Sequence, residues 1–414
     1  MSTLTLTLRQ PAQIGDKARS DFVRSTLDYL PGTVVRGAFA AAWIARHGVS
    51  EPGTPGRAGF LRLFEGDVRY GALLPVGAQF MPLSVVSHKY PASDDCPETD
   101  YDRAVHEQVP VRCPMCGSPF EQSRPGGRAR VNRRTSVVIG PSDVAARGGL
   151  VTRDALEAGQ SFAGTLIASE PELLDDLAAL GTIRVGGRRT TQGAADVTIS
   201  SDASPPTAER RPEGRLIIRL RSPGIFVDDH GRPAADPNPA ELESVLGCPA
   251  TVVKRWTRWQ AISGWHIASG LPKPADLAVA TGSTYLIEPA SAVSDSALGE
   301  LGRRGLGLRR HEGFGDLAPP PVLAPGRAAR EAEHRRRRRL VDDAAPLRGL
   351  QVRPAVWAEL LHLMTSYATG NQQATNSLRQ LAGRLDPRMA AALANYLSLP
   401  LDDAAYIAEE LRGS

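Results

Sequence analysis

Alternating apolar and polar residues at the start of the chain predict a β-strand. Leu4, Leu6 and Leu8 are separated by threonines, and a period of two is typical of a strand with one buried face. Three apolar segments later in the chain have a composition typical of strands and predict further strands at residues 135–139, 162–167 and 215–220.

A helical pattern follows the turn Pro31-Gly32-Thr33. Val35, Phe39 and Trp43 recur at helical spacing, and His47-Gly48 supplies the glycine that commonly ends a helix. Residues 354–412 contain four more helical stretches, which predict a small helical bundle.

The chain has 414 residues, too many for one ordinary domain. A polar linker at 201–213 and a charged connector at 324–340 divide it. A segment rich in Pro, Asp, Cys, His and Arg interrupts the first part and is predicted to be an irregular insertion. The predicted divisions are a first domain at 1–205 with its insertion at about 85–135, a second domain at 214–323 and a helical extension at 340–414.

An internal repeat indicates that the two predicted domains are related. Residues 187–197 align without gaps on residues 307–317, an offset of 120. Gly, Arg, Gly and Asp recur at 187/307, 189/309, 193/313 and 196/316. Both segments close a predicted domain.

Charge and cysteine content narrow the class of protein. The formal net charge is only +4, but the basic residues are mostly clustered arginines, which bind phosphate in a planar, bidentate way. A high-GC coding bias is the alternative origin of the arginines.

The most apolar stretch, 37–45, is far shorter than the roughly 20 residues that span a bilayer. Four cysteines in so long a chain favour a reducing, cytoplasmic location.

The segment Gly305–Leu317 carries the most specific chemistry. Its four glycines let the backbone turn sharply and approach a ligand, and successive backbone N–H groups in such a loop form an anion site. It matches neither a Walker loop nor a Rossmann turn. The alternative is a glycine-rich hairpin with solvated arginines.

This loop, G-h-G-x-R-R-x-E-G-F-G, resembles the C-terminal signature of the RAMP superfamily of CRISPR-associated proteins. Residues 26–38 are similar to the family's motif at the start of its first helix. Residues 262–273 and 281–285 are similar to the double-domain RAMP subunit of type III-D effector complexes. The resemblance covers about residues 1–320. The first domain departs from the pattern with Gly193-Ala194-Ala195, where Gly-x-Gly is usual.

The resemblance implies an α+β protein: two tandem ferredoxin-like (RRM-like) RAMP domains, β-α-β-β-α-β in plan, with a zinc-binding insertion and a C-terminal helical extension. It also implies a non-catalytic RNA-binding subunit of a type III CRISPR effector ribonucleoprotein, acting in antiviral defence. The expected partners are the guide RNA, gripped at its 5′ handle, the large polymerase-like subunit and the backbone RAMP subunits. Target RNA would be an indirect partner, and no membrane is involved.

The resemblance also assigns roles to residues. Arg36 would point toward RNA phosphates near the N-terminus of the first helix, and Gly37 would let that helix pack closely. Arg309 and Arg310 would grip the guide backbone. A weaker grip would come from Arg188 and Arg189. Further RNA contacts are expected at Arg24, Arg134, Trp265, Gly305, Gly307, Gly313 and Gly315.

Cys113-Pro114-Met115-Cys116-Gly117 has the spacing of half a zinc site. Tetrahedral zinc needs two more ligands, for which we favour Cys96 and His106, with His88 as the alternate. A structural zinc would hold a polar insertion in shape without a core. The alternative is a pair of thiols without a metal.

Two further functional classes compete with the RNA-binding subunit. An endoribonuclease, processing guide RNA or cutting target RNA, would draw on His47, Asp21 or Asp28. Against it, no supporting Tyr or Lys stands at a recognisable spacing, and an aspartate before a helix is more often a cap. The other class is a scaffold that contacts only proteins. We therefore expect no catalytic residues.

The remaining aromatic and basic clusters are ambiguous. Trp256, Trp259 and Trp265 are predicted to be core residues, with Trp265 the best candidate for base stacking. The arginine run 335–339 is either a solvated connector or a secondary RNA contact.

Overall fold

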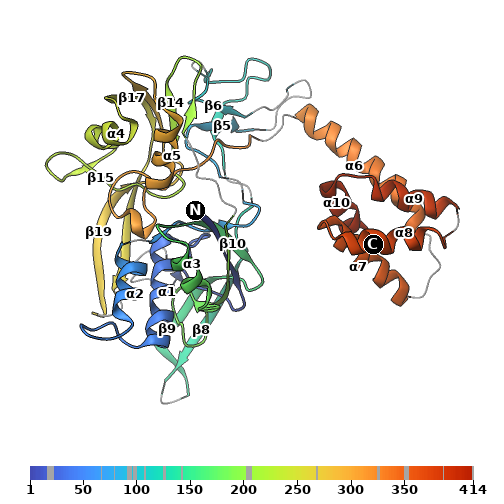
Figure 1. Ribbon diagram of the computed structural model, residues 1–414, viewed down its shortest axis with the longest axis horizontal. Coiled ribbons are helices and arrows are strands. Elements are labelled where there is room, and N and C mark those ends of the chain that lie inside the picture. The colour runs from blue at the N-terminus through green and yellow to red at the C-terminus, as the bar shows by residue number, and fades with distance from the viewer. Residues whose placement is uncertain are drawn as a thin grey trace. The chain divides into compact units, whose positions relative to one another are not determined.

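The computed structural model forms two compact units, Met1–Ala92 with Asp100–Leu323, and Ser93–Thr99 with Ala324–Ser414 (Figure 1). Asp21 lies outside the described residues. The structure describes residues 1–15, 23–66, 68–78, 80–90, 96, 100–106, 109–124, 127–140, 143–201, 208–266, 269–323, 327–348, 354–385 and 387–412.

The first unit begins with an antiparallel sheet in the order β11-β12-β1-β10-β3, with β4 also paired to β10. Its chain order places a helix after β1 and another after β10. The bounds are β1 Ser2–Leu8, α1 Gly32–His47, β3 Val68–Tyr70, β4 Leu74–Pro75, β10 Ser161–Ala168, α3 Glu172–Ala178, β11 Thr182–Arg184 and β12 Ala194–Ser200.

The alternation in β1 has the predicted consequence. Leu4, Leu6 and Leu8 are buried in one hydrophobic core, while the threonines between them are half-buried. Val35 and Phe39 of α1 join the same core. The predicted first strand and first helix are confirmed, and each contributes its apolar face to this core.

A second antiparallel sheet, in the order β13-β14-β20-β17, has its own core. One helix follows β14 and another follows β20, and Leu317 then bridges Leu220 beside β14. The bounds are β13 Glu209–Arg210, β14 Leu216–Arg219, α4 Pro239–Leu246, β17 Ala250–Trp256, β20 Thr284–Pro289 and α5 Asp295–Arg304.

A buried ion pair joins the two sheets of this unit. Arg69 Nη2 on β3 donates to Asp316 Oδ1 at 2.7 Å, and Thr165 Oγ1 on β10 donates to Asp316 Oδ2 at 3.0 Å. Asp316 is 1% exposed. A buried charge is tolerated only when it is paired and hydrogen-bonded, so these contacts hold the end of the second sheet's chain against the first sheet.

Smaller sheets extend from these cores. The segment at about 85–135, expected to be irregular, contains the small sheet β6-β5-β7. The β8–β9 hairpin projects from the first sheet (Figure 1), and every residue of β8 is exposed. The bounds are β2 Val23–Arg24, α2 Arg57–Leu61, the π-helix η1 Arg62–Gly66, β5 Val85–His88, β6 Tyr101–Asp102, β7 Phe120–Gln122, β8 Val131–Ile139, β9 Ala145–Leu156, β15 Phe226–Val227, β16 Pro233–Ala234, β18 Trp259–His266, β19 Leu271–Val279 and the 3-10 helix η2 Arg310–Glu312.

The second unit is helical. The four predicted stretches are α7 Pro354–Ala368, α8 Gln372–Ala382, α9 Pro387–Leu397 and α10 Leu401–Arg412, and α6 Arg327–Arg348 precedes them.

The arginine run 335–339, for which the sequence left open a solvated connector or a secondary RNA contact, lies inside α6. Arg336 pairs with Asp403 at 2.6 Å, and the Arg337 guanidinium lies 4.9 Å from the centre of the Tyr406 ring. Arginine is a good helix former, and these contacts add α6 to the bundle. Among the described residues, no helix has both the length and the apolar character needed to cross a bilayer.

Candidate nucleic-acid interface

Two glycine-rich loops of the first unit share one backbone path. Arg188 and Arg309 both have φ of 54°, in the left-handed region that non-glycine residues rarely adopt. The residues that precede these arginines make equivalent backbone hydrogen bonds. Gly187 N–H donates to Gln13 O, and Leu308 N–H donates to Ile225 O, both at 2.9 Å.

The ends of the loops match as well. Gly193 N–H donates to Pro11 O at 2.9 Å, and Gly315 N–H donates to Pro223 O at 2.8 Å. Arg188 is therefore equivalent to Arg309, 121 positions later, and the second loop has one additional residue before its last glycine. The ungapped repeat with an offset of 120 was therefore wrong, by one residue at Arg188 and by two at Gly193, because adjacent arginines and glycines let the letters match in the wrong register.

The four glycines of the second loop pack against the protein itself. A Cβ at any of them would lie between 1.6 and 2.5 Å from another part of this chain. The closest case is Gly315, whose Cβ would meet Leu306 O at 1.6 Å. The structure thus gives these glycines a role in chain packing, where the sequence had indicated approach to a ligand. The set is Gly305, Gly307, Gly313 and Gly315.

Close packing of α1 depends on Gly32 and not, as expected, on Gly37. A Cβ at Gly32 would lie 2.1 Å from Tyr70 O and 3.0 Å from Gly313 Cα, whereas one at Gly37 would meet nothing within 4 Å. Gly32 is the first residue of the helix, where α1 reaches the second loop, and this explains the difference. Gly37 instead lines a cavity.

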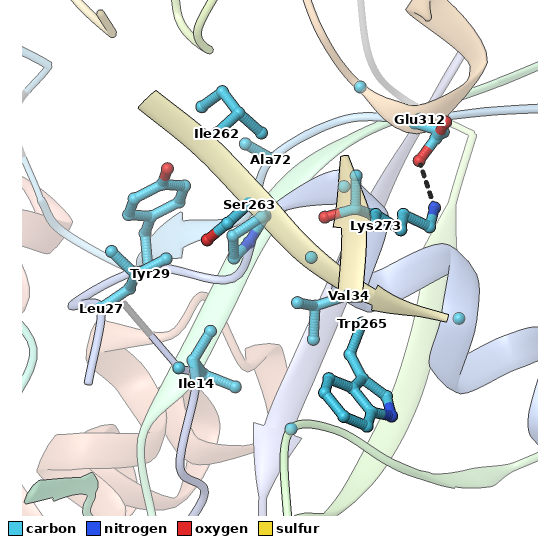
Figure 2. A pocket seen from close by; sticks show the side chains of 18 of the residues that line it. Ile14, Leu27, Tyr29, Val34, Ala72, Ile262, Ser263, Trp265, Lys273 and Glu312 are labelled. Carbon is cyan, nitrogen blue, oxygen red and sulfur yellow. Dashed lines mark hydrogen bonds and ion pairs between the residues drawn. The ribbon is translucent and has the colours of Figure 1, made fainter. Parts of the chain in front are cut away.

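That cavity, of about 770 Å³, lies among both loops, the start of α1 and the β18–β19 hairpin (Figure 2). Trp265 of β18 and Tyr29 lie along it (Figure 2). Trp265 is 61% exposed and Trp259 is 47% exposed, so the prediction that they are core residues was wrong. Trp259 and Trp265 both lie on β18, in the two-stranded β18–β19 sheet. Trp256 is half-buried and packs beside Ile217 and Leu286.

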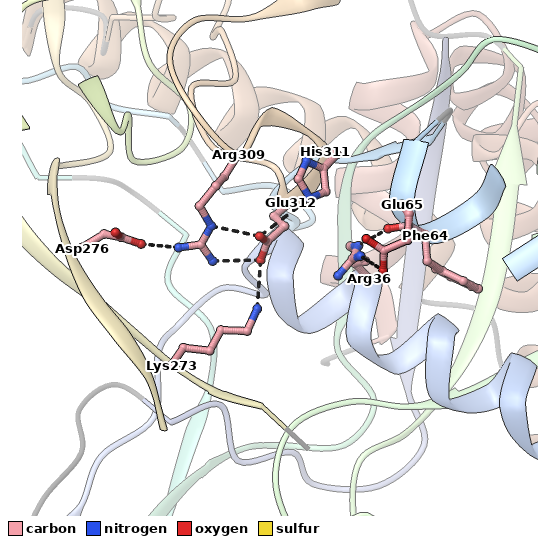
Figure 3. A network of polar contacts seen from close by, with 8 residues as sticks. All are labelled: Arg36, Phe64, Glu65, Lys273, Asp276, Arg309, His311 and Glu312. Carbon is pink, nitrogen blue, oxygen red and sulfur yellow. Dashed lines mark hydrogen bonds and ion pairs between the residues drawn. The ribbon is translucent and has the colours of Figure 1, made fainter. Parts of the chain in front are cut away.

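The arginine of the second loop is held by carboxylates of its own chain (Figure 3). Arg309 donates from Nε and Nη2 to the two oxygens of Glu312, each at 2.9 Å, and from Nη1 to Asp276. Lys273 Nζ lies 3.3 Å from Glu312 Oε2. Burial alone would raise the pKa of Glu312, but the hydrogen bonds and charges of Arg309 and Lys273 lower it to about 2.

The neighbouring predicted arginines are also paired. Arg310 Nη1 donates to Glu241 Oε1 at 3.1 Å, and Gly307 N–H donates to both oxygens of the same carboxylate at 3.0 Å. Arg36 donates to Phe64 O at 2.6 Å and to Glu65 at 2.9 Å (Figure 3). Carboxylates therefore already occupy the positions at which phosphates were expected.

The first loop differs in this respect. Within the described part of the chain, the side chains of Arg188 and Arg189 have no hydrogen-bond or ion-pair partner, and both residues line the cavity. Arg188 is exposed and Arg189 is half-buried.

Three arginines lie in register across the sheet β2-β9-β8. Arg24 pairs with Arg153, and Arg153 pairs with Arg134. Burial, and then the charges of Arg188 and Arg24, lower the pKa of Arg153, which places Arg188 near the same group. Arg24 and Arg134 were predicted from the sequence, but Arg153 was missed, because only the strand register shows that it joins them.

A cluster of metal-ligand type forms near the Cys113–Cys116 turn. The potential ligand atoms of His88, Cys96, Cys113 and Cys116 all lie within 4.8 Å of one another. Two sulfurs each about 2.3 Å from zinc lie about 3.8 Å apart in a tetrahedral site, so this spacing fits a single ion. Three thiols and one imidazole could bind a metal, and they suit zinc.

The fourth member of this cluster is His88, the alternate, and not His106. His88 pairs with Phe120 across β5 and β7, and Lys89 N–H donates to Pro119 O at 2.9 Å. This ladder places the end of β5 beside the cysteine turn. His106 follows β6 instead, with its ring 6.0 Å from that of Tyr101.

The two candidate catalytic residues that the structure describes, Asp28 and His47, do not form one site. Asp28 is exposed before α1, and His47 is the last residue of that helix, with its ring 4.1 Å from the Trp43 ring. A 16-residue helix separates its ends by roughly 20 Å. Acid–base partners must be within hydrogen-bond reach, so these two residues do not act together.

Comparison with known proteins agrees with the sequence motifs. Residues 155–317 match the family model described as CRISPR-associated protein (Cas_Cmr3). No curated protein matches the chain.

Several solved structures are similar. A cryo-EM structure of the type III-B Cmr-beta complex, bound to cognate target RNA and AMPPnP, is similar at 12% identity over 69% of this chain and 86% of that chain, with a TM-score of 0.40. A Csm3–Csm4 subcomplex of the type III-A interference complex matches at 11% identity over 78% and 99%, with a TM-score of 0.35. A protein from a Cas6-related gene of Pyrococcus furiosus matches at 9% identity over 78% and 98%, with a TM-score of 0.32.

Residues 155–317 are thus similar to a family of CRISPR-associated proteins, in agreement with the resemblance that the glycine-rich motifs indicate. The second sheet and its glycine-rich loop lie within this matching segment.

Proposed function

We propose that this protein is a non-catalytic RNA-binding subunit of a type III CRISPR effector ribonucleoprotein. It grips the guide RNA at its 5′ handle and contacts the large polymerase-like subunit and the backbone RAMP subunits, in cytoplasmic antiviral defence. The observation that carries this proposal is the first glycine-rich loop, whose Arg188 and Arg189 side chains line the cavity and have no partner among the residues that the structure describes.

The cavity offers the chemistry that single-stranded RNA needs. An exposed Trp265 provides a surface on which a base stacks. The first turn of α1, Gly32 to Val34, also lines the cavity, and the N-terminus of a helix favours anions. Arg188 and Arg189 add positive charge for the backbone. These groups recognise RNA without requiring a particular sequence.

We further propose that both sheets of the first unit belong to ferredoxin-like RAMP domains. Each has the chain order β-α-β-β-α-β, with the last element of the second reduced to the bridge between Leu317 and Leu220. In the first sheet the core strands lie in the order β12-β1-β10-β3. The equivalence of the two glycine-rich loops supports two related domains.

The loops differ in what they offer an RNA. The sequence favoured Arg309 and Arg310 as the stronger grip, but an RNA phosphate there must compete with Glu312 and Glu241. We therefore propose the reverse ranking, with Arg188 and Arg189 the stronger pair. Arg36, paired with Glu65, belongs with the weaker group.

The alternatives are an endoribonuclease and a protein-only scaffold. The separation of Asp28 from His47 counts against a joint catalytic site, although each residue alone still supports the nuclease hypothesis. The unpaired arginines count against a pure scaffold. Zinc, held by His88, Cys96, Cys113 and Cys116, is the metal that we propose for the insertion.

The test is to purify the tagged full-length protein from its native host and sequence the RNA that accompanies it. Guides with a shared 5′ repeat handle, together with other effector subunits, are the expected result. Cellular RNA without that handle, or no RNA, would contradict the proposal. Shortened or trimmed guides that lengthen in the His47→Ala or Asp28→Ala variant would favour the nuclease.

The ranking of the loops has its own comparison. We expect Arg188→Ala with Arg189→Ala to reduce guide retention more than Arg309→Ala with Arg310→Ala. The paired variants differ only in which loop they alter. An equal loss from both pairs would refute the ranking and leave RNA binding itself intact.

A further inference from the structure

The sheet β2-β9-β8 carries a row of like charges on one face. Residues that pair directly across strands share a face, so the register places Arg24, Arg153 and Arg134 side by side. Neighbouring strands lie about 4.8 Å apart, which makes the row roughly 10 Å long. We call these three residues the arginine row.

Among the described residues of the β8–β9 register, no acidic side chain lies on the same face as the arginine row. Its same-face neighbours in the β8–β9 register are Asn132, Ser136, Val151 and Ala155. Arg153 makes one side-chain hydrogen bond, from Nη1 to Ser136 Oγ at 3.1 Å. In the described structure, Arg24 and Arg134 are exposed and have no side-chain partner.

The opposite face of the same hairpin shows the ordinary arrangement. Arg133 donates to both oxygens of Asp154, at 2.7 and 3.0 Å, and Asp154 is 8% exposed. Arg133 of β8 is thus paired with a carboxylate, while Arg134, the next residue along the strand, lies directly opposite Arg153. Like charges placed directly opposite each other destabilise a sheet, so an unneutralised row indicates a surface that receives an anion.

Arg188 connects the arginine row to the first glycine-rich loop. Its charge contributes to the lowered pKa of Arg153, after burial. Arg188 itself lines the cavity. Positive charge therefore continues from the cavity to the sheet, over a length greater than that of a single phosphate.

We infer that the arginine row binds consecutive phosphates of one RNA strand as that strand leaves the cavity past Arg188. This deepens the proposed RNA-binding function and rests on it. It assigns a contact to Arg153 and extends the phosphate-binding surface from Arg188 onto the sheet β2-β9-β8. Contacts to phosphate fix the position of the strand without reading its sequence.

The experiment measures binding of a fluorescently labelled oligouridylate to the full-length chain at several salt concentrations. Each phosphate contact to a single strand adds about 0.7 to the slope of log affinity against log salt. Arg153→Ala should lower that slope by about 0.7 and weaken binding by up to about tenfold at low salt. Arg24→Ala with Arg134→Ala, at two exposed positions, should lower it by about 1.4.

The matched control is Arg130→Ala, which removes an exposed arginine near the same hairpin, paired with Glu157 at 3.3 Å. We expect its slope to equal that of the unaltered protein. An unaltered protein without salt-sensitive RNA binding would overturn the proposed function. Strong, salt-sensitive binding that neither row variant reduces beyond Arg130→Ala would overturn only the assignment of the arginine row.

Discussion

At the scale of single residues, the partner of each arginine decides what it can do. Arg309 lies between Glu312 and Asp276 and has its guanidinium 4.9 Å from the centre of the Phe314 ring. Arg188 has the same unusual φ, but no described residue pairs with its side chain. A paired guanidinium gains little from a phosphate, because it must first lose a bidentate carboxylate. Arg188 and Arg309 thus occupy equivalent positions but differ in their capacity to bind a phosphate.

Glu312 gives a pH-dependent prediction. Its folded pKa of about 2 lies below the ordinary value of 4.5, so its ionised form stabilises the fold above pH 4.5, and this stabilisation is lost as the pH falls toward 2. Glu312→Gln should lower the free energy of unfolding by about 1–3 kcal/mol at pH 7. The difference from the unaltered protein should shrink below pH 4.5, as measured by denaturant unfolding at several pH values.

The control for that series is Glu300→Gln, at a carboxylate that is 54% exposed and pairs with Arg303 on the same helix. An exposed ion pair of this kind contributes about 0–1 kcal/mol. If both variants gave the same stability at every pH, Glu312 would have no special role in holding the second loop.

At the scale of elements, strand pairing brings the candidate metal-binding and RNA-binding side chains together. The ladder between β5 and β7 brings His88 beside the Cys113–Cys116 turn, and the register of β9 brings Arg153 between two other arginines. His88 lies 25 residues before Cys113, and Arg153 lies 19 residues after Arg134, so neither contact is visible in a local stretch of sequence. Pairing between strands distant in sequence makes the site.

The cysteine cluster gives a prediction for metal content. The purified protein should contain about one zinc per chain, and Cys113→Ser should lose it. His88→Ala should weaken zinc retention against a chelator, because an imidazole ligand is lost. Elemental analysis before and after dialysis with the chelator measures both effects.

His106→Ala and Cys248→Ser are the matched controls, since neither residue belongs to the cluster. Both should retain zinc like the unaltered protein. Retention by His88→Ala together with loss by His106→Ala would restore the ligand set first expected from the sequence.

At the scale of the whole molecule, each compact unit has its own hydrophobic core. The first contains two sheets with separate clusters of buried residues, joined by the contact of Arg69 with Asp316. The second has a core formed by α6 to α10, with Met364 and Leu393 fully buried. Separate cores favour separate cooperative unfolding.

Calorimetry should therefore resolve two unfolding transitions. Met364→Ala should destabilise one of them by about 2–5 kcal/mol, and Leu166→Ala should destabilise the other by a similar amount, because each removes a fully buried side chain. A single transition that both substitutions shift equally would show that the units unfold together.

The sequence by itself determined the periodic elements and the chemistry of the loops. The alternation of Leu4, Leu6 and Leu8 with threonines specified a strand, and the spacing of Val35 and Phe39 specified a helix, because each pattern has one apolar face to bury. The motif glycines and arginines indicated the RAMP class, and two cysteines two residues apart indicated a metal site. These signals are local, so they are readable along the chain.

Only the tertiary structure decided which of these residues act together. The choice of His88 over His106, the partnership of Arg309 with Glu312, the exposure of Trp265 and the place of Arg153 all depend on pairing between distant segments. Strand register and ion pairing are set by burial and geometry in three dimensions. A one-residue shift, such as that between Arg188 and Arg189 in the repeat, changes which residue is equivalent to Arg309 but leaves the local sequence pattern the same.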